Sequence, residues 1–146
     1  MCNKQMDKQS QDTIRIELIV LAAPDYGDGV CMHGQLEIFI NQRKPYDESS
    51  DIIDEHILFD SMDKNGEYFI FSCCCGIPSC SGWNKGINVI HYENQIEWTD
   101  LNKNESWIFD KNSIKDQLKT VREEAIFYKE YFRKKDIDYV GVGYTW

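Results

Sequence analysis

Four of the six cysteines in this sequence fall within eight positions, in the stretch FSCCCGIPSCSGW. Zinc prefers thiolate and imidazole ligands in a tetrahedral shell, and these ligands converge from a turn and at least one further element. Cys73, Cys75 and the returning Cys80 can supply three thiolates, because a glycine and a proline between them allow the chain to reverse. We expect His91 to be the fourth ligand if its strand runs beside the strand that ends at Cys73.

Two other states of these cysteines remain open at the level of the sequence. Reduced thiols in a tight turn need no metal, because free cysteine is among the most buried residue types. A redox role is the third alternative, although the sequence has no Cys-x-x-Cys motif and a disulfide between adjacent cysteines would be strained. Zinc is therefore the one cofactor that we expect, on the condition that the thiolates bind a metal.

The elements that would position these side chains are mostly strands. Apolar residues alternate with polar ones, or gather between turn residues, in six segments: 13–22, 35–41, 67–73, 86–92, 95–100 and 105–110. The acidic segment 47–63 has neither period clearly, and we interpret it as a short helix or an irregular crossover.

The period then changes to that of a helix. Apolar residues recur every three or four positions from Ile114 to Phe132, which predicts an amphipathic helix of about 22 residues. Ser113 and Asp116 resemble a capping box at its start. The pattern predicts an α+β fold, in which an antiparallel sheet of about five to six strands carries one long C-terminal helix on a face.

The length and composition predict one domain. A chain of 146 residues can bury a sizeable core, and 42% hydrophobic residues is a globular value. We expect residues 1–12 to be a flexible tail and residues 13–146 to be a single α+β domain. The beginning of the sequence lacks the apolar region of a signal peptide, and no later run is long enough to cross a membrane, so we expect a cytoplasmic protein.

The formal net charge of -9 narrows the choice of partners. Nucleic acid and membrane surfaces are excluded as expected partners, since binding to phosphate depends on basic side chains. A basic protein is the natural electrostatic partner. Seven acids and no lysine or arginine occur in segment 47–63: Asp47, Glu48, Asp51, Asp54, Glu55, Asp60 and Asp63. This run is either a docking surface for a basic protein or a solvated face that keeps the protein soluble.

Three aromatic residues raise the same question of docking. Phe127 and Tyr131 project about 100 to 140 degrees away from the apolar stripe of the predicted helix. Trp83 lies three positions after Cys80, the last of the clustered cysteines. Aromatic anchors surrounded by acids are typical of a protein that captures a basic partner, whereas the alternative is that they form the edge of a wide buried face.

The sequence gives little support to an enzyme. The Gly-x-Ser-x-Gly motif, the phosphate-binding P-loop and the Gly-x-Gly-x-x-Gly fingerprint do not occur. A zinc site with three cysteines is more typical of a structural site than of a catalytic one. We therefore expect a non-enzymatic protein.

The stretch CCCGIPSCSGWNKGINVIHYENQIEW also resembles the Cys-x-Cys-Gly-x-x-x-Cys-x-Gly motif of a loose group of small bacterial proteins. The residues that carry the resemblance are Cys73, Cys75, Gly76, Cys80, Gly82, Gly86, Val89, His91, Ile96 and Trp98. Some members of this group resemble immunity proteins of contact-dependent or polymorphic toxin systems. The resemblance covers roughly the C-terminal half and implies an immunity protein that neutralises a basic, nuclease-like toxin. The alternative is a zinc-stabilised structural or regulatory domain.

Overall fold

The computed structural model describes residues 11–24, 27 and 29–146, and these residues form nine strands, two α-helices and one 3-10 helix. The strands are β1 (Ile14–Pro24), β2 (Val30–Ile40), β3 (Asp51–Ile53), β4 (Gly66–Tyr68), β5 (Phe71–Cys73), β6 (Ile87–His91), β7 (Gln95–Asp100), β8 (Glu105–Asp110) and β9 (Tyr139–Gly141). The helices are α2 (Glu55–Asp60), η1 (Pro78–Ser81) and α3 (Lys111–Lys134).

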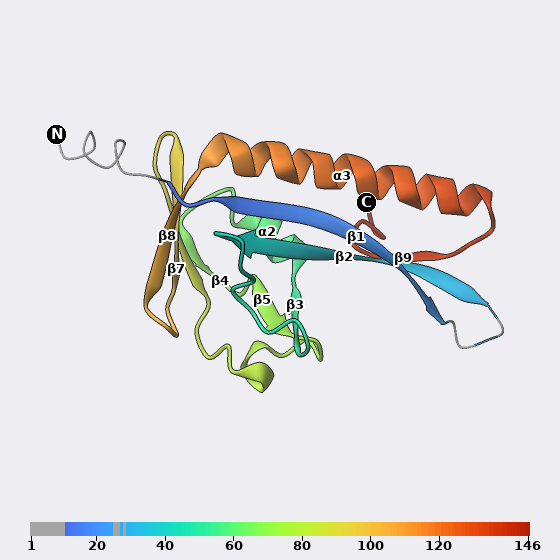
Figure 1. Ribbon diagram of the computed structural model, residues 1–146, viewed down its shortest axis with the longest axis horizontal. Helices are drawn as coiled ribbons and strands as arrows, with labels where there is room; N and C mark the ends of the chain where they lie inside the picture. Colours follow the sequence, from blue (N-terminus) through green and yellow to red (C-terminus); the bar gives the residue numbers. More distant parts are fainter. Residues whose placement is uncertain (1–10, 25–26, 28) are drawn as a thin grey trace.

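These strands divide into three sheets, with the orders β1-β2-β9, β3-β5 and β4-β6-β7-β8. The long helix α3 runs along β1, as Figure 1 shows. The α+β class with one long C-terminal helix packed on a sheet is therefore confirmed. The strands pair in three separate groups instead of one sheet of about five to six strands, and β9 pairs with β2 in parallel.

The hairpin of β1 and β2 is the longest paired element. All eleven residues of β1 pair with β2, from Ile14 opposite Ile40 to Pro24 opposite Val30. We expected the second strand to begin at Gln35, but it begins at Val30, since pairing with β1 continues through Gly34. The two strands run beside α3 and extend about as far as the end of the helix (Figure 1).

The predicted strand 67–73 is divided between two sheets. Its first part, β4, pairs with β6, and its last part, β5, pairs with β3. Between them, the carbonyl oxygen of Ile70 accepts a hydrogen bond of 2.8 Å from the N–H of Asp54. The change of partner at this point decides the surroundings of the cysteines.

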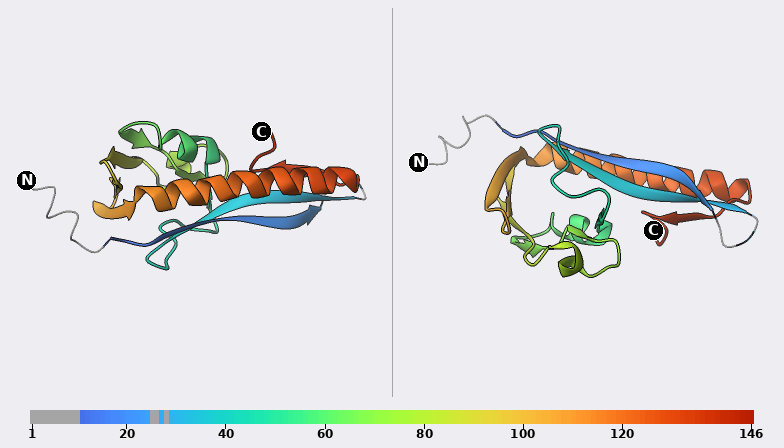
Figure 2. Two further views of the ribbon diagram at one scale, coloured as in Figure 1. Left: turned by 90° about the horizontal axis from the view of Figure 1, so that it is seen from above. Right: turned by 60° about the horizontal axis from the view of Figure 1, so that its bottom comes forward.

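Helix α3 begins three residues earlier than the predicted capping box. Its N-cap is Asp110, whose side chain accepts a hydrogen bond of 3.2 Å from the N–H of Ser113. The Ser113 cap is therefore wrong: Ser113 lies inside the first turn, because Asp110 already satisfies one of the free N–H groups there. Further along, the side chain of Gln117 accepts a hydrogen bond from the N–H of Ile16 and donates one to the carbonyl of Ile14. This amide joins α3 to β1, and Figure 2 shows the helix and the strand side by side.

The junction of β2 and β9 depends on two glycines. A Cβ atom at Gly34 would lie 2.0 Å from the hydroxyl of Tyr139, and one at Gly141 would lie 2.2 Å from the carbonyl oxygen of Gly34. The hydroxyl of Tyr139 donates a hydrogen bond of 2.7 Å to the carbonyl of Val142. The chain after α3 therefore returns to the sheet through a contact that only glycine allows.

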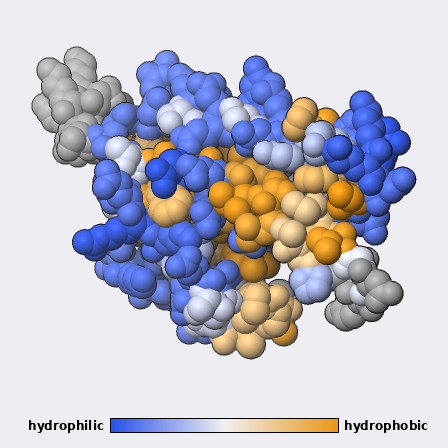
Figure 3. Space-filling model, turned by 45° about the vertical axis from the view of Figure 1, so that its right-hand side comes forward, coloured by the Kyte–Doolittle hydropathy of each residue, from blue (hydrophilic) through white to orange (hydrophobic). Residues whose placement is uncertain are grey.

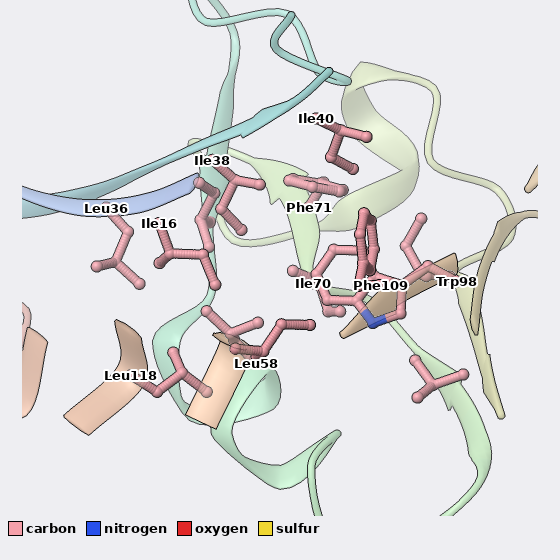
Figure 4. Packing of buried hydrophobic residues seen from close by; sticks show 14 of the residues in the cluster. Ile16, Leu36, Ile38, Ile40, Leu58, Ile70, Phe71, Trp98, Phe109 and Leu118 are labelled. Carbon is pink, nitrogen blue, oxygen red and sulfur yellow. The ribbon is translucent and has the colours of Figure 1, made fainter. Parts of the chain in front are cut away.

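The core joins the sheets and both α-helices. Leu58 of α2 and Leu118 of α3 point into the same interior as Ile16, Ile70 and the aromatic residues of β7 and β8, as Figure 4 shows. Trp98 and Phe109 are completely buried and lie edge to face, with ring centres 5.4 Å apart. Apolar burial on this scale is the main stabilising contribution in a domain of this size.

The expected flexible tail, 1–12, lies mostly outside the described residues. Its last residue, Asp12, is hydrogen-bonded to Ile108 through both its backbone and its side chain. The backbone N–H of Asp12 donates to the carbonyl of Ile108, and the carboxylate of Asp12 accepts from the N–H of Ile108, each at 2.8 Å. Asp12 therefore belongs to the folded part. Among the residues described, no helix is both long and apolar enough to span a membrane.

Candidate metal centre

The cysteine turn, which we define as residues 73–83, starts where β5 ends. The N–H of Gly76 donates a hydrogen bond of 2.8 Å to the carbonyl of Cys73, with Gly76 at a φ of 94 degrees. Pro78 then opens the 3-10 helix η1, in which Cys80 bonds back to the carbonyl of Ile77 at 3.0 Å. The two reversals bring Cys80 back toward the end of β5.

The geometry places three thiols together. The sulfur atoms of Cys73, Cys75 and Cys80 all lie within 4.8 Å of one another. Cys73 is buried, whereas Cys75 and Cys80 are exposed. Cys74 is exposed as well and lies outside this group, because its N–H bonds to the carbonyl of Ser50 and successive side chains of an extended segment alternate in direction. The three sulfurs are close enough together to hold a metal ion.

The thiols of the cluster differ in acidity. The backbone N–H of Cys75 lowers the pKa of Cys73 below its usual value, with help from the neighbouring thiols. Hydrogen bonds with Cys75 and Cys73 raise the pKa of Cys80 to about 11. The negative charge of Cys73 raises the pKa of Cys74. The lowered pKa of Cys73 favours its thiolate, and a bound cation would favour the loss of further protons from the cluster.

One carboxylate anchors the cysteine turn. Asp51 of β3 pairs with Cys73 across the two-stranded sheet. Its two oxygens accept hydrogen bonds from the hydroxyl of Ser81 at 2.5 Å and from the indole N–H of Trp83 at 3.0 Å. The N–H of Asp47 donates to the same carboxylate at 3.0 Å. One acidic side chain therefore contributes three hydrogen bonds that position η1 relative to β5.

An aromatic column supports the same turn from inside. The ring of Trp83 packs against Phe71 with centres 5.3 Å apart, and Phe71 stacks on Tyr46 at 5.1 Å. Trp83 is only 7% exposed. We predicted Trp83 as a docking residue, and this is wrong, because its ring belongs to the core and its N–H is bound to Asp51.

His91 does not join the three thiols, although we expected it to be the fourth ligand. Its strand, β6, pairs with β4 and β7, whereas the strand that ends at Cys73 pairs with β3. The ring nitrogen Nε2 of His91 lies 2.8 Å from the carbonyl oxygen of Ser61. The backbone N–H of His91 donates a hydrogen bond to the side-chain oxygen of Asn65. The expectation failed because it required β5 and β6 to be neighbours.

Most of the acidic run is committed to the chain's own hydrogen bonds. Asp47 accepts bonds from the N–H and hydroxyl of Ser49, and Asp54 caps α2 through the N–H of Ile57. The others with partners are Asp51, described above, Glu48, which forms an ion pair with Lys44, and Glu55, which accepts a bond from the N–H of Gly143.

In the part of the chain that the structure describes, the two acids of the run without a side-chain bond are Asp60 and Asp63, both exposed. A docking role for the run in binding a basic toxin stays a prediction. It would depend mainly on these two carboxylates, because the other five have structural partners.

The two helix aromatics lie on the surface. Phe127 is 61% exposed and Tyr131 is 45% exposed. Their rings stack with centres 5.9 Å apart, and Tyr128 and Phe132 continue the aromatic contacts toward the sheet. These exposed fractions disagree with the alternative in which Phe127 and Tyr131 form the edge of a buried face.

Sequence reasoning missed the role of Asp51 and of Ser81. Both occupy positions that a sequence pattern treats as ordinary, since an acid in an acidic run and a serine after a cysteine carry no distinctive spacing. The only local signal is the Ser-Gly-Trp segment that follows Cys80. It places a hydroxyl and an indole N–H two positions apart, and these two donors share one acceptor.

Comparisons of the chain with models of protein families, with curated proteins and with solved structures found no match. The function must therefore be inferred from the geometry of the cysteine turn.

Proposed function

We propose that Cys73, Cys75 and Cys80 bind a zinc ion, and that the chain is a zinc-stabilised structural or regulatory domain. The observation that carries this proposal is the approach of three sulfur atoms to within 4.8 Å of one another. Thiolates at the usual Zn–S distance of about 2.3 Å in a tetrahedral shell lie about 3.8 Å apart. Small rotations of exposed side chains are enough to close the difference.

The donor set favours zinc over harder cations. Three thiolates are soft ligands, whereas magnesium and calcium take oxygen ligands. Cys73 supplies the buried ligand, and the exposed Cys75 and Cys80 leave the fourth position on the solvent side. Water fills that position in the simplest case.

Zinc would stabilise the least regular part of the fold. The turn joins a three-residue strand to a four-residue 3-10 helix, and neither is long enough to be stable alone. A ligand that binds the folded state and not the unfolded chain stabilises the fold, and the stabilisation grows with the logarithm of its affinity. The metal would therefore tie η1 to β5 at the same place as Asp51.

The test is zinc stoichiometry by native mass spectrometry after refolding with zinc and removal of the excess. We expect one zinc per chain, and its loss in Cys73→Ser, Cys75→Ser and Cys80→Ser. Two matched controls should keep the metal: Cys74→Ser, the neighbouring thiol outside the cluster, and His91→Gln, whose side chain can still bond to Ser61. Retention of zinc in the three cluster variants, or no zinc in the unmodified protein, would overturn the proposal.

A further inference from the structure

The exposed aromatic pair of α3, Phe127 and Tyr131, lies between acidic residues on one side and basic residues on the other. Phe127 and Tyr131 share one side of the helix, about 100 to 140 degrees from its buried stripe. Figure 3 turns the end of the molecule that holds the second half of α3 forward and shows both apolar and polar surface there. An apolar area within a polar rim is the usual anatomy of a protein interface.

The rim of this aromatic face is acidic at one end and basic at the other. Glu123 and Glu124 precede Phe127, and Lys134 and Lys135 follow Tyr131. All four charged residues are exposed. Among the described residues, neither glutamate takes part in an ion pair. In the view from above, no described element lies over α3 (Figure 2).

We infer that this face binds the same face of a second copy of the chain, with the two α3 helices antiparallel. A two-fold axis midway between Phe127 and Tyr131 places Phe127 of each copy opposite Tyr131 of the other. The same axis places Glu123 opposite Lys135 and Glu124 opposite Lys134. The four aromatic rings form the centre, and opposite charges meet on both sides of it.

The order of the charges selects the antiparallel arrangement. In a parallel pair, each glutamate would face the same glutamate of the other copy, and each lysine would face the same lysine. Such like-charge contacts are unfavourable. A two-fold interface must be self-complementary, and this face meets that condition without any change of backbone. The contact from residue 123 to residue 135 extends about 18 Å along the helix.

Lys135 is already placed at the edge of this centre. Its Nζ atom lies 5.1 Å from the centre of the Tyr131 ring, an attraction between a cation and the face of the ring. In the dimer, Glu123 of the second copy joins this pair. Large aromatic anchors supply most of the binding energy in such contacts, and the charges mainly fix the orientation.

The decisive experiment uses two charge-reversed variants in analytical ultracentrifugation, at protein concentrations up to about 1 mM, which corresponds to weak affinity. The variant Glu123→Lys with Glu124→Lys, and the variant Lys134→Glu with Lys135→Glu, should each be monomeric. Mixed in equal amounts, they should form a one-to-one heterodimer, because every rim contact is then attractive. The unmodified protein should be in equilibrium between monomer and dimer.

Two controls separate this face from a general effect of charge or apolar surface. Asp63→Lys with Glu93→Lys makes the same change in net charge at exposed positions elsewhere, and it should dimerise like the unmodified protein. Phe127→Ala should abolish the dimer, whereas Ile126→Ala, at an exposed residue on another side of α3, should not. A monomeric unmodified protein, self-association of either charge variant, or failure of the mixture to associate would overturn the inference.

Discussion

The cysteine turn and the hairpin of β1 and β2 under α3 have different sources of order. The hairpin has eleven paired residues in each strand and an apolar face that α3 covers. The turn follows a pairing of only three residues and depends on the carboxylate of Asp51 and the ring of Trp83. Repetition of an apolar pattern stabilises the first region, and a few specific contacts stabilise the second. The hairpin should therefore respond to changes of packing, and the turn to changes of single polar groups or of a bound metal.

The largest loss of stability is expected where β9 packs tightly against β2, at Gly141. Gly141→Ala places a Cβ against the carbonyl oxygen of Gly34 at a residue with a φ of 95 degrees. Strain and overpacking together should lower the free energy of unfolding by about 3 kcal/mol. Urea denaturation measures the change. Gly29→Ala is the matched control, since a Cβ there meets no atom within 4 Å, and equal stability of the two variants would contradict the tight approach of β9 to β2.

A smaller effect is expected in the turn. Asp51→Ala leaves the indole N–H of the buried Trp83 without its acceptor and frees Ser81. Loss of such a buried acceptor should cost about 2 kcal/mol of unfolding free energy. It should also weaken zinc binding about tenfold, as removal of residues that orient metal ligands does.

Calorimetry and zinc titration measure the two effects of this change. Asp60→Ala, at an exposed acid of the same run, is the control and should change neither. If Asp51→Ala kept full stability and full zinc affinity, the turn would not depend on this carboxylate.

The smallest effect at pH 7 is expected at Tyr139 of β9, and it depends on pH. Burial, with a smaller contribution from the charge of Glu55, raises the pKa of Tyr139 to about 12 from an ordinary value of 10.0. Between these pH values the unfolded chain has lost this proton and the folded chain has kept it, so the stabilisation is complete below pH 10 and is lost as the pH rises to 12.

Tyr139→Phe tests this dependence. The variant should be less stable than the unmodified protein by about 1 kcal/mol at pH 7, because the hydrogen bond to the carbonyl of Val142 is lost. The difference should shrink between pH 10 and pH 12 in urea denaturation. Tyr144→Phe, at an exposed tyrosine, should show no such convergence. A constant difference across this range would mean that the Tyr139 proton is not held by the fold.

The two regions also differ in how far the sequence predicts them. The segments predicted as 95–100 and 105–110 coincide with β7 and β8, and the helical period predicts α3. These elements have a local signal, because the period of side-chain burial is set by the geometry of one strand or one helix. The three cysteines of the candidate site were also identified correctly as neighbours, since one turn brings them together.

What could not be predicted depends on pairing between distant segments. The residues from 67 to 73 look like one strand, and nothing local indicates that Phe69 and Ile70 separate a strand that pairs with β6 from one that pairs with β3. Because the sequence does not show which strands are neighbours, we wrongly predicted His91 as a metal ligand and Trp83 as a surface residue. Side-chain period encodes which face is apolar, but it does not encode which strand is the neighbour.

The most direct test of the zinc proposal is X-ray absorption spectroscopy at the zinc edge of the zinc-loaded protein. The account predicts three sulfur neighbours at about 2.3 Å and one lighter neighbour at about 2.0 Å. The lighter neighbour should be a water oxygen, so His91→Gln should leave the spectrum unchanged. A shell of nitrogen and oxygen without sulfur, or an imidazole signal that disappears in His91→Gln, would contradict binding by Cys73, Cys75 and Cys80 alone.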